Sequence, residues 1–133
     1  KENMEKKLVQ TMRQICREIG IHVKGQYLVK RADVFEKVAL REICYIYKEQ
    51  KNSIFVTLQG KKANRESLKE VAGKLPKEQF VMAERGYIVN LLHVERLEKG
   101  MLTMDNGDLI KVGRGHNREI MQKMSEYMER GWR

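Results

Sequence analysis

The chain has 133 residues, with 27 lysines and arginines against 18 aspartates and glutamates, and a formal net charge of +9. This length fits one compact domain, and an apolar fraction of 41% is typical of a globular chain rather than a disordered one. No run of about 18 apolar residues occurs, which excludes a transmembrane helix, and the basic balance favours a polyanionic partner such as nucleic acid or an anionic membrane surface.

Residues 2–19 are predicted to form an amphipathic helix that ends at Gly20. Apolar side chains recur there at helical spacing: Leu8, Met12, Ile15 and Ile19. Such a helix could dock on the domain, pair with a second copy or belong to an upstream module. Because the chain begins at Lys1 rather than at a methionine, we expect a fragment of a longer polypeptide.

Short strands are predicted from residue 21 onward. Residues 21–34 carry short apolar segments broken at Gly25, and two denser β-branched and aromatic runs follow at residues 42–47 and 53–58. The polar residues 48–52 form the predicted loop between these two runs. Residues 59–62 are a predicted turn, and another short strand is expected after it.

The second half of the chain begins with a short predicted helix. Ser67, or the two residues before it, opens this helix, and Pro76 ends it. Phe80 and Val81 are expected to be buried. A polar tip at residues 84–86 then leads into the apolar residues 87–89.

A hairpin and a terminal helix complete the predicted fold. After a strand around Val94 and Leu97, Asn106–Gly107 between two apolar runs is a strong hairpin signal. A glycine-punctuated polar loop, residues 113–117, precedes a helix over about residues 117–129. The predicted apolar stripe of that helix contains Ile120, Met121, Met124, Tyr127 and Met128. The fold class is therefore mostly β (α+β), with a short internal helix and helices at both ends.

Cysteine and histidine usage points to no cofactor or metal. Cys16 and Cys44 form no CxxC pair, so we expect reduced thiols in a cytoplasmic protein, with a regulatory disulfide as the alternative. The histidines have no cysteine or carboxylate at ligand spacing: His22, His93 and His116.

No catalytic motif is present in the sequence. GxSxG, HExxH and GxxxxGK[ST] are absent, and Gly113–Arg114–Gly115 lacks the third glycine of a dinucleotide fingerprint. We therefore expect no enzymatic activity. A small enzyme acting on an acidic substrate stays as an alternative, although the sequence contains no recognisable nucleophile–base set and nothing selects a pair of catalytic carboxylates.

Basic and amide side chains gather in three predicted loops. They are Lys48, Gln50, Lys51 and Asn52 in the first, Arg85 in the second, and Arg114, His116, Asn117 and Arg118 in the third. Arginine and asparagine can pair with guanine and adenine edges, and lysine and arginine neutralise phosphates. The alternative is that polar residues simply favour loops. The aromatic residues Tyr45, Tyr47 and Phe55 lack an RNA-binding box and are expected to pack in the sheet.

Residues 80–94, FVMAERGYIVNLLHV, resemble the signature segment of the LytTR family of DNA-binding domains. In that family an Arg-Ser-Tyr-Ile-Val-Asn type of segment follows a phenylalanine and a helix that begins Ser-Leu, as at Ser67–Leu68 here. Residues 42–46 are similar to the family's Asp-Ile-x-Tyr-Ile strand, and residues 106–112 to its glycine hairpin. Arg114 falls where the family has Ser-Arg-Arg. The resemblance covers roughly residues 27–124.

The resemblance implies sequence-specific binding of double-stranded DNA for transcription regulation, with loops inserted into successive major grooves and no recognition helix. Carried over to this chain, the base-contacting residues are Asn52, Arg85 and, in the third loop, Arg114 or His116. Gly115 replaces the family's second arginine there. The residues expected to contact phosphates are Lys48, Lys51, Asn117 and Arg118. Tyr87 and Asn90 belong to the motif but are expected to be structural, Tyr87 in the core and Asn90 at a tight turn.

The family also implies a domain organisation and partners. Residues 1–20 would be the last helix and linker of an upstream receiver domain, and residues 21–133 the DNA-binding output domain of a response regulator. Paired direct-repeat sites on DNA and a homodimer on DNA are expected, without a membrane or small-molecule partner. The alternative is a protein-interaction module that dimerises through the terminal helices.

Overall fold

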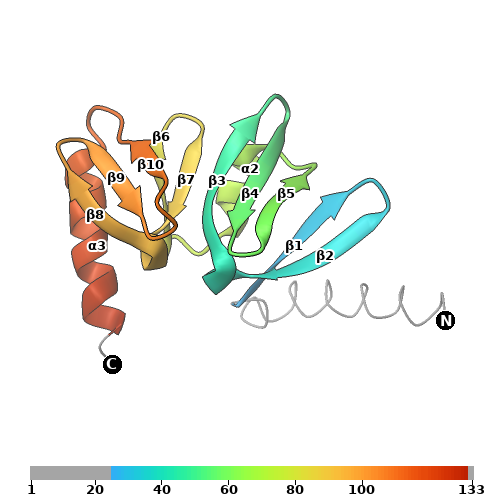
Figure 1. The fold of residues 1–133 in the computed structure, drawn as a ribbon, viewed down its shortest axis with the longest axis horizontal. Coiled ribbons are helices and arrows are strands. Elements are labelled where there is room, and N and C mark those ends of the chain that lie inside the picture. Colours follow the sequence, from blue (N-terminus) through green and yellow to red (C-terminus); the bar gives the residue numbers. More distant parts are fainter. Residues whose placement is uncertain (1–24, 132–133) are drawn as a thin grey trace.

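The computed structural model describes residues 25–131, which form three antiparallel sheets and two α-helices (Figure 1). A two-stranded sheet pairs β1 (Gln26–Arg31) with β2 (Val34–Ala39). The central sheet has the order β5-β4-β3-β7-β6, and the third sheet has the order β10-β9-β8. The predicted class, mostly β with small antiparallel sheets, is confirmed, whereas the helix predicted over residues 2–19 lies outside the described residues.

The strands of the central sheet are β3 (Ile43–Glu49), β4 (Asn52–Thr57), β5 (Gly60–Asn64), β6 (Phe80–Glu84) and β7 (Tyr87–Asn90). Those of the third sheet are β8 (Val94–Glu98), β9 (Met101–Met104) and β10 (Leu109–Lys111). The helices are α2 (Leu68–Lys74) and α3 (Asn117–Gly131), and single 3-10 turns, η1 (Leu40–Glu42) and η2 (Leu91–His93), precede β3 and β8.

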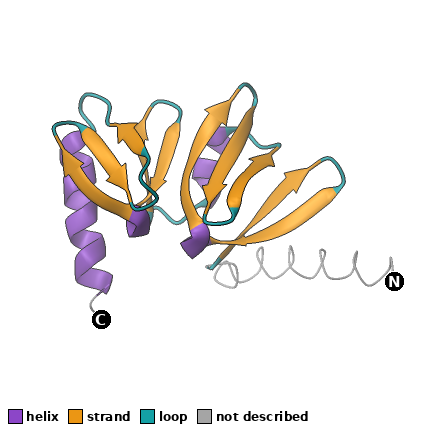
Figure 2. Ribbon diagram, viewed as in Figure 1, coloured by secondary structure: helices purple, strands orange, loops and turns teal. Residues whose placement is uncertain are grey.

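The central sheet carries a separate apolar cluster on each face. Side chains alternate between the faces of a strand, so neighbouring residues enter different clusters. In β4, Phe55 belongs to the cluster with β1, β2 and α2, and Val56 to the cluster with β8–β10 and α3. In β7, Ile88 and Val89 divide in the same way. Figure 2 shows α2 behind the central sheet and α3 beside the third sheet.

Helix α2 begins and ends where its sequence requires. The Ser67 hydroxyl accepts a hydrogen bond from the Glu70 amide, and the Glu70 carboxylate accepts one from the Ser67 amide, which forms a capping box. Val71 is fully buried, and Pro76 follows the last turn, where it has no amide proton to continue the helix. The predicted start at Ser67 and end at Pro76 are confirmed.

Neighbouring segments form hydrogen bonds at both outer edges of the central sheet. On the β5 side, the Arg65 amide donates to the Lys30 carbonyl at 2.8 Å, and the Lys30 amide donates to the Asn64 side chain at 3.0 Å. On the β6 side, the Gly113 amide donates to the Ala83 carbonyl at 2.9 Å. The two-stranded sheet and the start of the third loop are thereby attached to the central sheet.

Asn90 has the structural role that was predicted for it. Its side chain is fully buried, and its amide nitrogen donates to the carbonyls of Leu40 at 3.0 Å and Ile43 at 2.8 Å. Its amide oxygen accepts from the Leu92 backbone at 3.0 Å and from the Gln79 side chain at 3.3 Å. One side chain therefore joins η1 to η2 and fixes the lower ends of β3 and β7.

Glu66 is a buried carboxylate held by three donors. Tyr27 donates to it at 2.6 Å, Asn64 at 3.3 Å, and Lys74 from α2 forms an ion pair with it. Burial alone would raise the pKa of Glu66, but these hydrogen bonds and the Lys74 charge outweigh it and hold the pKa below its ordinary value. Burial of Tyr27 and its hydrogen bond to the Glu66 carboxylate raise the pKa of Tyr27.

This lowered pKa predicts a pH-dependent contribution to stability. A depressed carboxylate pKa stabilises the folded state above the unfolded pKa, and that contribution is lost as pH falls through the folded pKa. We expect urea unfolding midpoints of the wild type and Glu66→Gln to differ most at about pH 6 and to converge toward about pH 3. A constant difference across that range would contradict the ionised state of Glu66.

The predicted apolar stripe of α3 is wrong in its width. Met121 and Met128 are 59% and 56% exposed, because α3 packs with the face that carries Ile120, Met124 and Tyr127 and leaves the adjoining stripe in solvent. Tyr87, predicted to pack in the core, is half-buried and packs against the apolar cluster that contains Val56 and Val89. The turn predicted at residues 59–62 is also shorter, since β5 already begins at Gly60, whose φ is +114°.

Candidate nucleic-acid interface

The three polar loops lie along one edge of the molecule (Figure 1). They are the β3–β4 turn, the β6–β7 turn and the segment between β10 and α3. We call this region the tip surface, defined by residues 48–52, 84–86 and 113–118. The turns η1 and η2 lie at the opposite ends of β3 and β7.

The first part of the tip surface is tighter than predicted. Glu49 pairs with Asn52, so the turn contains only Gln50 and Lys51, and Gln50 adopts a left-handed φ of +57°. Lys48 therefore lies in β3, where it pairs with Ser53, and Asn52 begins β4. The predicted loop over residues 48–52 is wrong in extent, because the β-ladder continues almost to the tip. Its polar side chains are nonetheless exposed.

The second part lies directly beside the first. The predicted tip is confirmed, but the turn between β6 and β7 contains only Arg85 and Gly86, because Glu84 ends β6 and pairs with Tyr87. Gly86 has a φ of +92° that favours glycine. The Gly86 carbonyl accepts a hydrogen bond from the Lys48 amide at 2.9 Å. This bond brings the turn that carries Arg85 next to the strand end that leads to Asn52.

The third part packs on the second. Besides the Gly113 bond to Ala83, a Cβ atom on Gly113 would lie 3.2 Å from the His116 ring and 3.7 Å from the Glu84 side chain. The His116 amide donates to the Gly113 carbonyl at 3.1 Å. Glycine at 113 thus permits the close approach of this segment to β6.

Two features of the third part differ from the sequence-based expectation. Asn117 and Arg118 lie in the first turn of α3 rather than in a loop. Gly115 has a φ of +88°, in a region that side chains other than glycine enter with strain. An arginine at position 115 would be strained in this backbone.

The tip surface presents unpaired cationic side chains. Lys48, Lys51, Arg85, Arg114 and Arg118 are all exposed, and between residues 25 and 129 none of them takes part in an ion pair or a side-chain hydrogen bond. His116 is half-buried, with its Nδ1 atom 3.9 Å from Glu119. Free guanidinium and ammonium groups at an exposed edge can accept phosphates and base edges without first breaking internal contacts.

Three half-buried tyrosines from β3 and β7 form a cluster that sequence reasoning treated only as separate packing residues. The Tyr47 and Tyr87 rings stack with centroids 6.0 Å apart and planes at 29°, and Tyr45 lies 6.3 Å and 6.2 Å from them. The Tyr45 hydroxyl donates to Asp108 at 2.9 Å, and burial together with this carboxylate raises the pKa of Tyr45. The aromatic residues at the alternate positions Tyr45 and Tyr47 were a local signal for one face of β3, but their contact with Tyr87 depends on the β3–β7 register.

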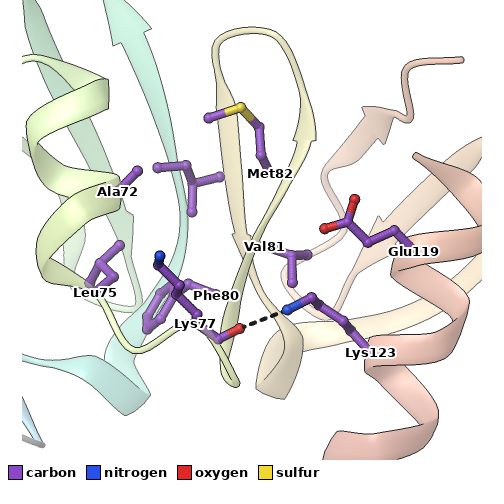
Figure 3. A pocket seen from close by; sticks show the side chains of 9 residues that line it. Ala72, Leu75, Lys77, Phe80, Val81, Met82, Glu119 and Lys123 are labelled. Carbon is purple, nitrogen blue, oxygen red and sulfur yellow. Dashed lines mark hydrogen bonds between the residues drawn. The ribbon is translucent and has the colours of Figure 1, made fainter. Parts of the chain in front are cut away.

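A groove of about 180 Å³, whose lining contains none of these tyrosines, lies between α2, β6 and α3 (Figure 3). Its apolar floor includes Leu75, Phe80 and Val81, and the Lys123 ammonium donates to the Lys77 carbonyl at 3.3 Å across its rim. The groove contains none of the predicted site residues.

Two further observations concern the described part of the chain. Among residues 25–131, no group of three histidine, cysteine, aspartate or glutamate side chains could hold a metal ion. No helix in the same range is long and apolar enough to cross a membrane.

Comparisons with known proteins agree with the arrangement of the strands. The family model of the LytTr DNA-binding domain matches residues 33–125. The fold is similar to the solved LytTr DNA-binding domain of a methyl-accepting/DNA response regulator from Bacillus cereus, with a TM-score of 0.65 and 22% sequence identity. That similarity covers 75% of this chain and 96% of the solved chain. No curated protein sequence matches the chain.

Proposed function

The chain belongs to the LytTR family of DNA-binding domains, and from this premise we propose that its tip surface recognises a specific sequence of double-stranded DNA to regulate transcription. The observation that carries the proposal is the adjacency of the three loops. The Lys48–Gly86 and Gly113–Ala83 bonds hold them side by side on one exposed edge. Such a row of loops fits insertion into successive major grooves without a recognition helix.

Each residue of the tip surface has a proposed role. Asn52 and Arg85 contact base edges, since their exposed side chains can form the paired hydrogen bonds that distinguish adenine and guanine. Arg114 or His116 supplies the third base contact, in place of the arginine that Gly115 removes. The phosphate contacts come from Lys48, Lys51, Asn117 and Arg118. Asn117 and Arg118 lie in the first turn of α3, where the helix N-terminus also favours an anion.

The wider organisation follows from the same premise. We propose that residues 21–133 are the output domain of a response regulator, and that residues 1–20 connect it to a receiver domain. We further propose that it occupies paired direct repeats, with two copies on one duplex. Limited proteolysis of the full-length protein would test the boundary, and cleavage concentrated near residue 21 is the expected result.

Selection of bound duplexes from a random DNA pool tests the proposed function. Enrichment of a short motif, bound at least about 10³-fold more tightly than random duplex, is the expected result for a specific DNA-binding protein. Binding to all duplexes with equal affinity would contradict the proposal and would leave only general attraction between a basic domain and DNA.

The phosphate contacts predict a specific salt dependence. We expect Lys51→Gln to weaken binding to all duplexes by a similar factor and to reduce the slope of log affinity against log salt by about 1, because one fewer counterion is released. Fluorescence anisotropy at several salt concentrations measures this slope. The matched control is Lys37→Gln on β2, which is exposed but outside the tip surface and should leave the slope unchanged. Equal slopes for wild type and Lys51→Gln would remove Lys51 from the interface.

A further inference from the structure

Sequence recognition by two separate turns requires that the turns keep a fixed spacing. The β3–β4 and β6–β7 turns belong to strands that pair through β3 and β7, but that pairing ends at Tyr47 and Tyr87. On the side of the turns, one backbone hydrogen bond follows this last pair: the Lys48 amide donates to the Gly86 carbonyl. Among residues 25–131, this bond joins the two turns. A single bond at an exposed end would open easily by fraying if nothing supported it.

The tyrosine cluster lies where such support is needed. Tyr47 and Tyr87 are directly opposite each other in the β3–β7 register, and each adjoins one partner of the Lys48–Gly86 bond in the sequence. Their rings are stacked at 6.0 Å, and directly opposite aromatic pairs stabilise the local strand pairing. The last pair of the ladder before the turns is therefore reinforced by its side chains.

The cluster is itself held from both sides. Tyr45 packs against both rings and donates its hydroxyl hydrogen bond to Asp108 in the β9–β10 turn. On the other side, the Lys61 ammonium of β5 lies 5.6 Å from the centre of the Tyr47 ring, in a cation–π contact. The rings thus connect the two turns to β5 and to the third sheet.

We propose that Tyr47 and Tyr87 are positioning residues that fix the spacing between Asn52 and Arg85. This inference rests on the proposed function, because it assigns those two tips to base recognition. The tyrosines act through the backbone of the turns and make no contact with the bases themselves. Their loss reduces the discrimination between DNA sequences, while the free cations that bind any duplex stay in place.

The test uses leucine and phenylalanine variants of both positions in the whole chain. Leucine keeps apolar bulk but removes the stacked ring, whereas phenylalanine keeps the ring. The first measurement, made without DNA, is hydrogen exchange at the Lys48 amide. We expect exchange about three- to tenfold faster in Tyr47→Leu and Tyr87→Leu, and near the wild-type rate in the phenylalanine variants.

The second measurement is the affinity ratio between the selected duplex and a scrambled duplex. We expect this ratio to fall by about three- to tenfold in the leucine variants, with scrambled-duplex affinity unchanged and the phenylalanine variants near wild type. Tyr127→Leu is the matched control, since Tyr127 is a half-buried tyrosine of α3 outside the cluster. It should change neither measurement, which separates positioning from a general loss of stability.

The outcomes distinguish the two proposals. The positioning role would be overturned if Tyr47→Leu and Tyr87→Leu both gave the same Lys48 exchange rate and the same affinity ratio as Tyr127→Leu. Faster Lys48 exchange with an unchanged ratio would also overturn it, because the spacing would then not matter for recognition. A wild-type protein that binds both duplexes equally would instead refute the proposed function, whatever the exchange measurement shows. If one leucine variant fails to fold, the other decides the question.

Discussion

Asn90→Ala is expected to lower the free energy of unfolding by about 2–4 kcal/mol, one of the largest effects of any single substitution in the described chain. The alanine leaves the Leu92 amide without its side-chain acceptor and removes a donor from the carbonyls of Leu40 and Ile43, two buried residues. Urea denaturation monitored by circular dichroism measures the loss.

Asn52 provides the matched control for this prediction. It is the same residue type, but its side chain is exposed at the start of β4, so Asn52→Ala should change the free energy of unfolding by no more than about 0.5 kcal/mol. The same variant should weaken binding to the selected duplex. If both alanine variants had equal stability, the buried hydrogen bonds of Asn90 would not support the junction between η1 and η2.

Arg85→Ala is expected to reduce affinity for the selected duplex by about 10- to 100-fold, equivalent to about 1–3 kcal/mol, and to relax the preference at one base pair. Arg85 is exposed and has no partner within residues 25–131, so removing its guanidinium should leave the unfolding midpoint unchanged. Anisotropy titrations with the selected duplex and single-base variants of it measure both effects.

Two further variants define what Arg85 contributes. Arg85→Lys keeps the charge but loses the paired hydrogen bonds, so it should retain the salt slope and lose most of the base preference. Arg41→Ala is the positional control, because Arg41 is also exposed but lies in η1, at the end of β3 opposite the tips. Affinity reduced equally by Arg41→Ala and Arg85→Ala would show that only net charge matters.

Local signals in the sequence were sufficient for many of the elements. Ser67 and Glu70 stand at the spacing of a capping box, and Pro76 excludes further helix, so the limits of α2 follow from adjacent residues. Asn106–Gly107 predicts the β9–β10 hairpin for a similar reason, since glycine readily adopts the φ of +95° found at Gly107. These interactions involve residues within about one turn of each other.

Features that depend on distant residues were not predictable in this way. Nothing in the sequence distinguishes Glu66 from the other carboxylates, but Tyr27 donates to it from 39 positions earlier in the chain and Lys74 of α2 forms an ion pair with it. The stripe of α3 was predicted too wide, because periodicity does not indicate how much of a helix its neighbours cover. Met121 and Met128 are exposed for that reason.

The candidate site shows the same division. The sequence and its family resemblance identified three polar loops and the exposed side chains on them. Their adjacency depends on bonds such as Lys48 to Gly86, between strands that are far apart in the chain. The stacked pair of Tyr47 and Tyr87 likewise requires the β3–β7 register, which alternation within one strand does not specify.

The hydrogen bonds at the two outer edges of the central sheet affect how two copies of the domain could lie next to each other on DNA. An open strand edge is a template for joining another chain, and the two copies proposed to share one duplex would face each other at a very high local concentration. The backbone bonds from Arg65 to Lys30, just beyond β5, and from Gly113 to Ala83 of β6 occupy part of each edge with the protein's own backbone. In the proposed arrangement of two copies on one duplex, these edges would therefore resist edge-to-edge aggregation between the copies.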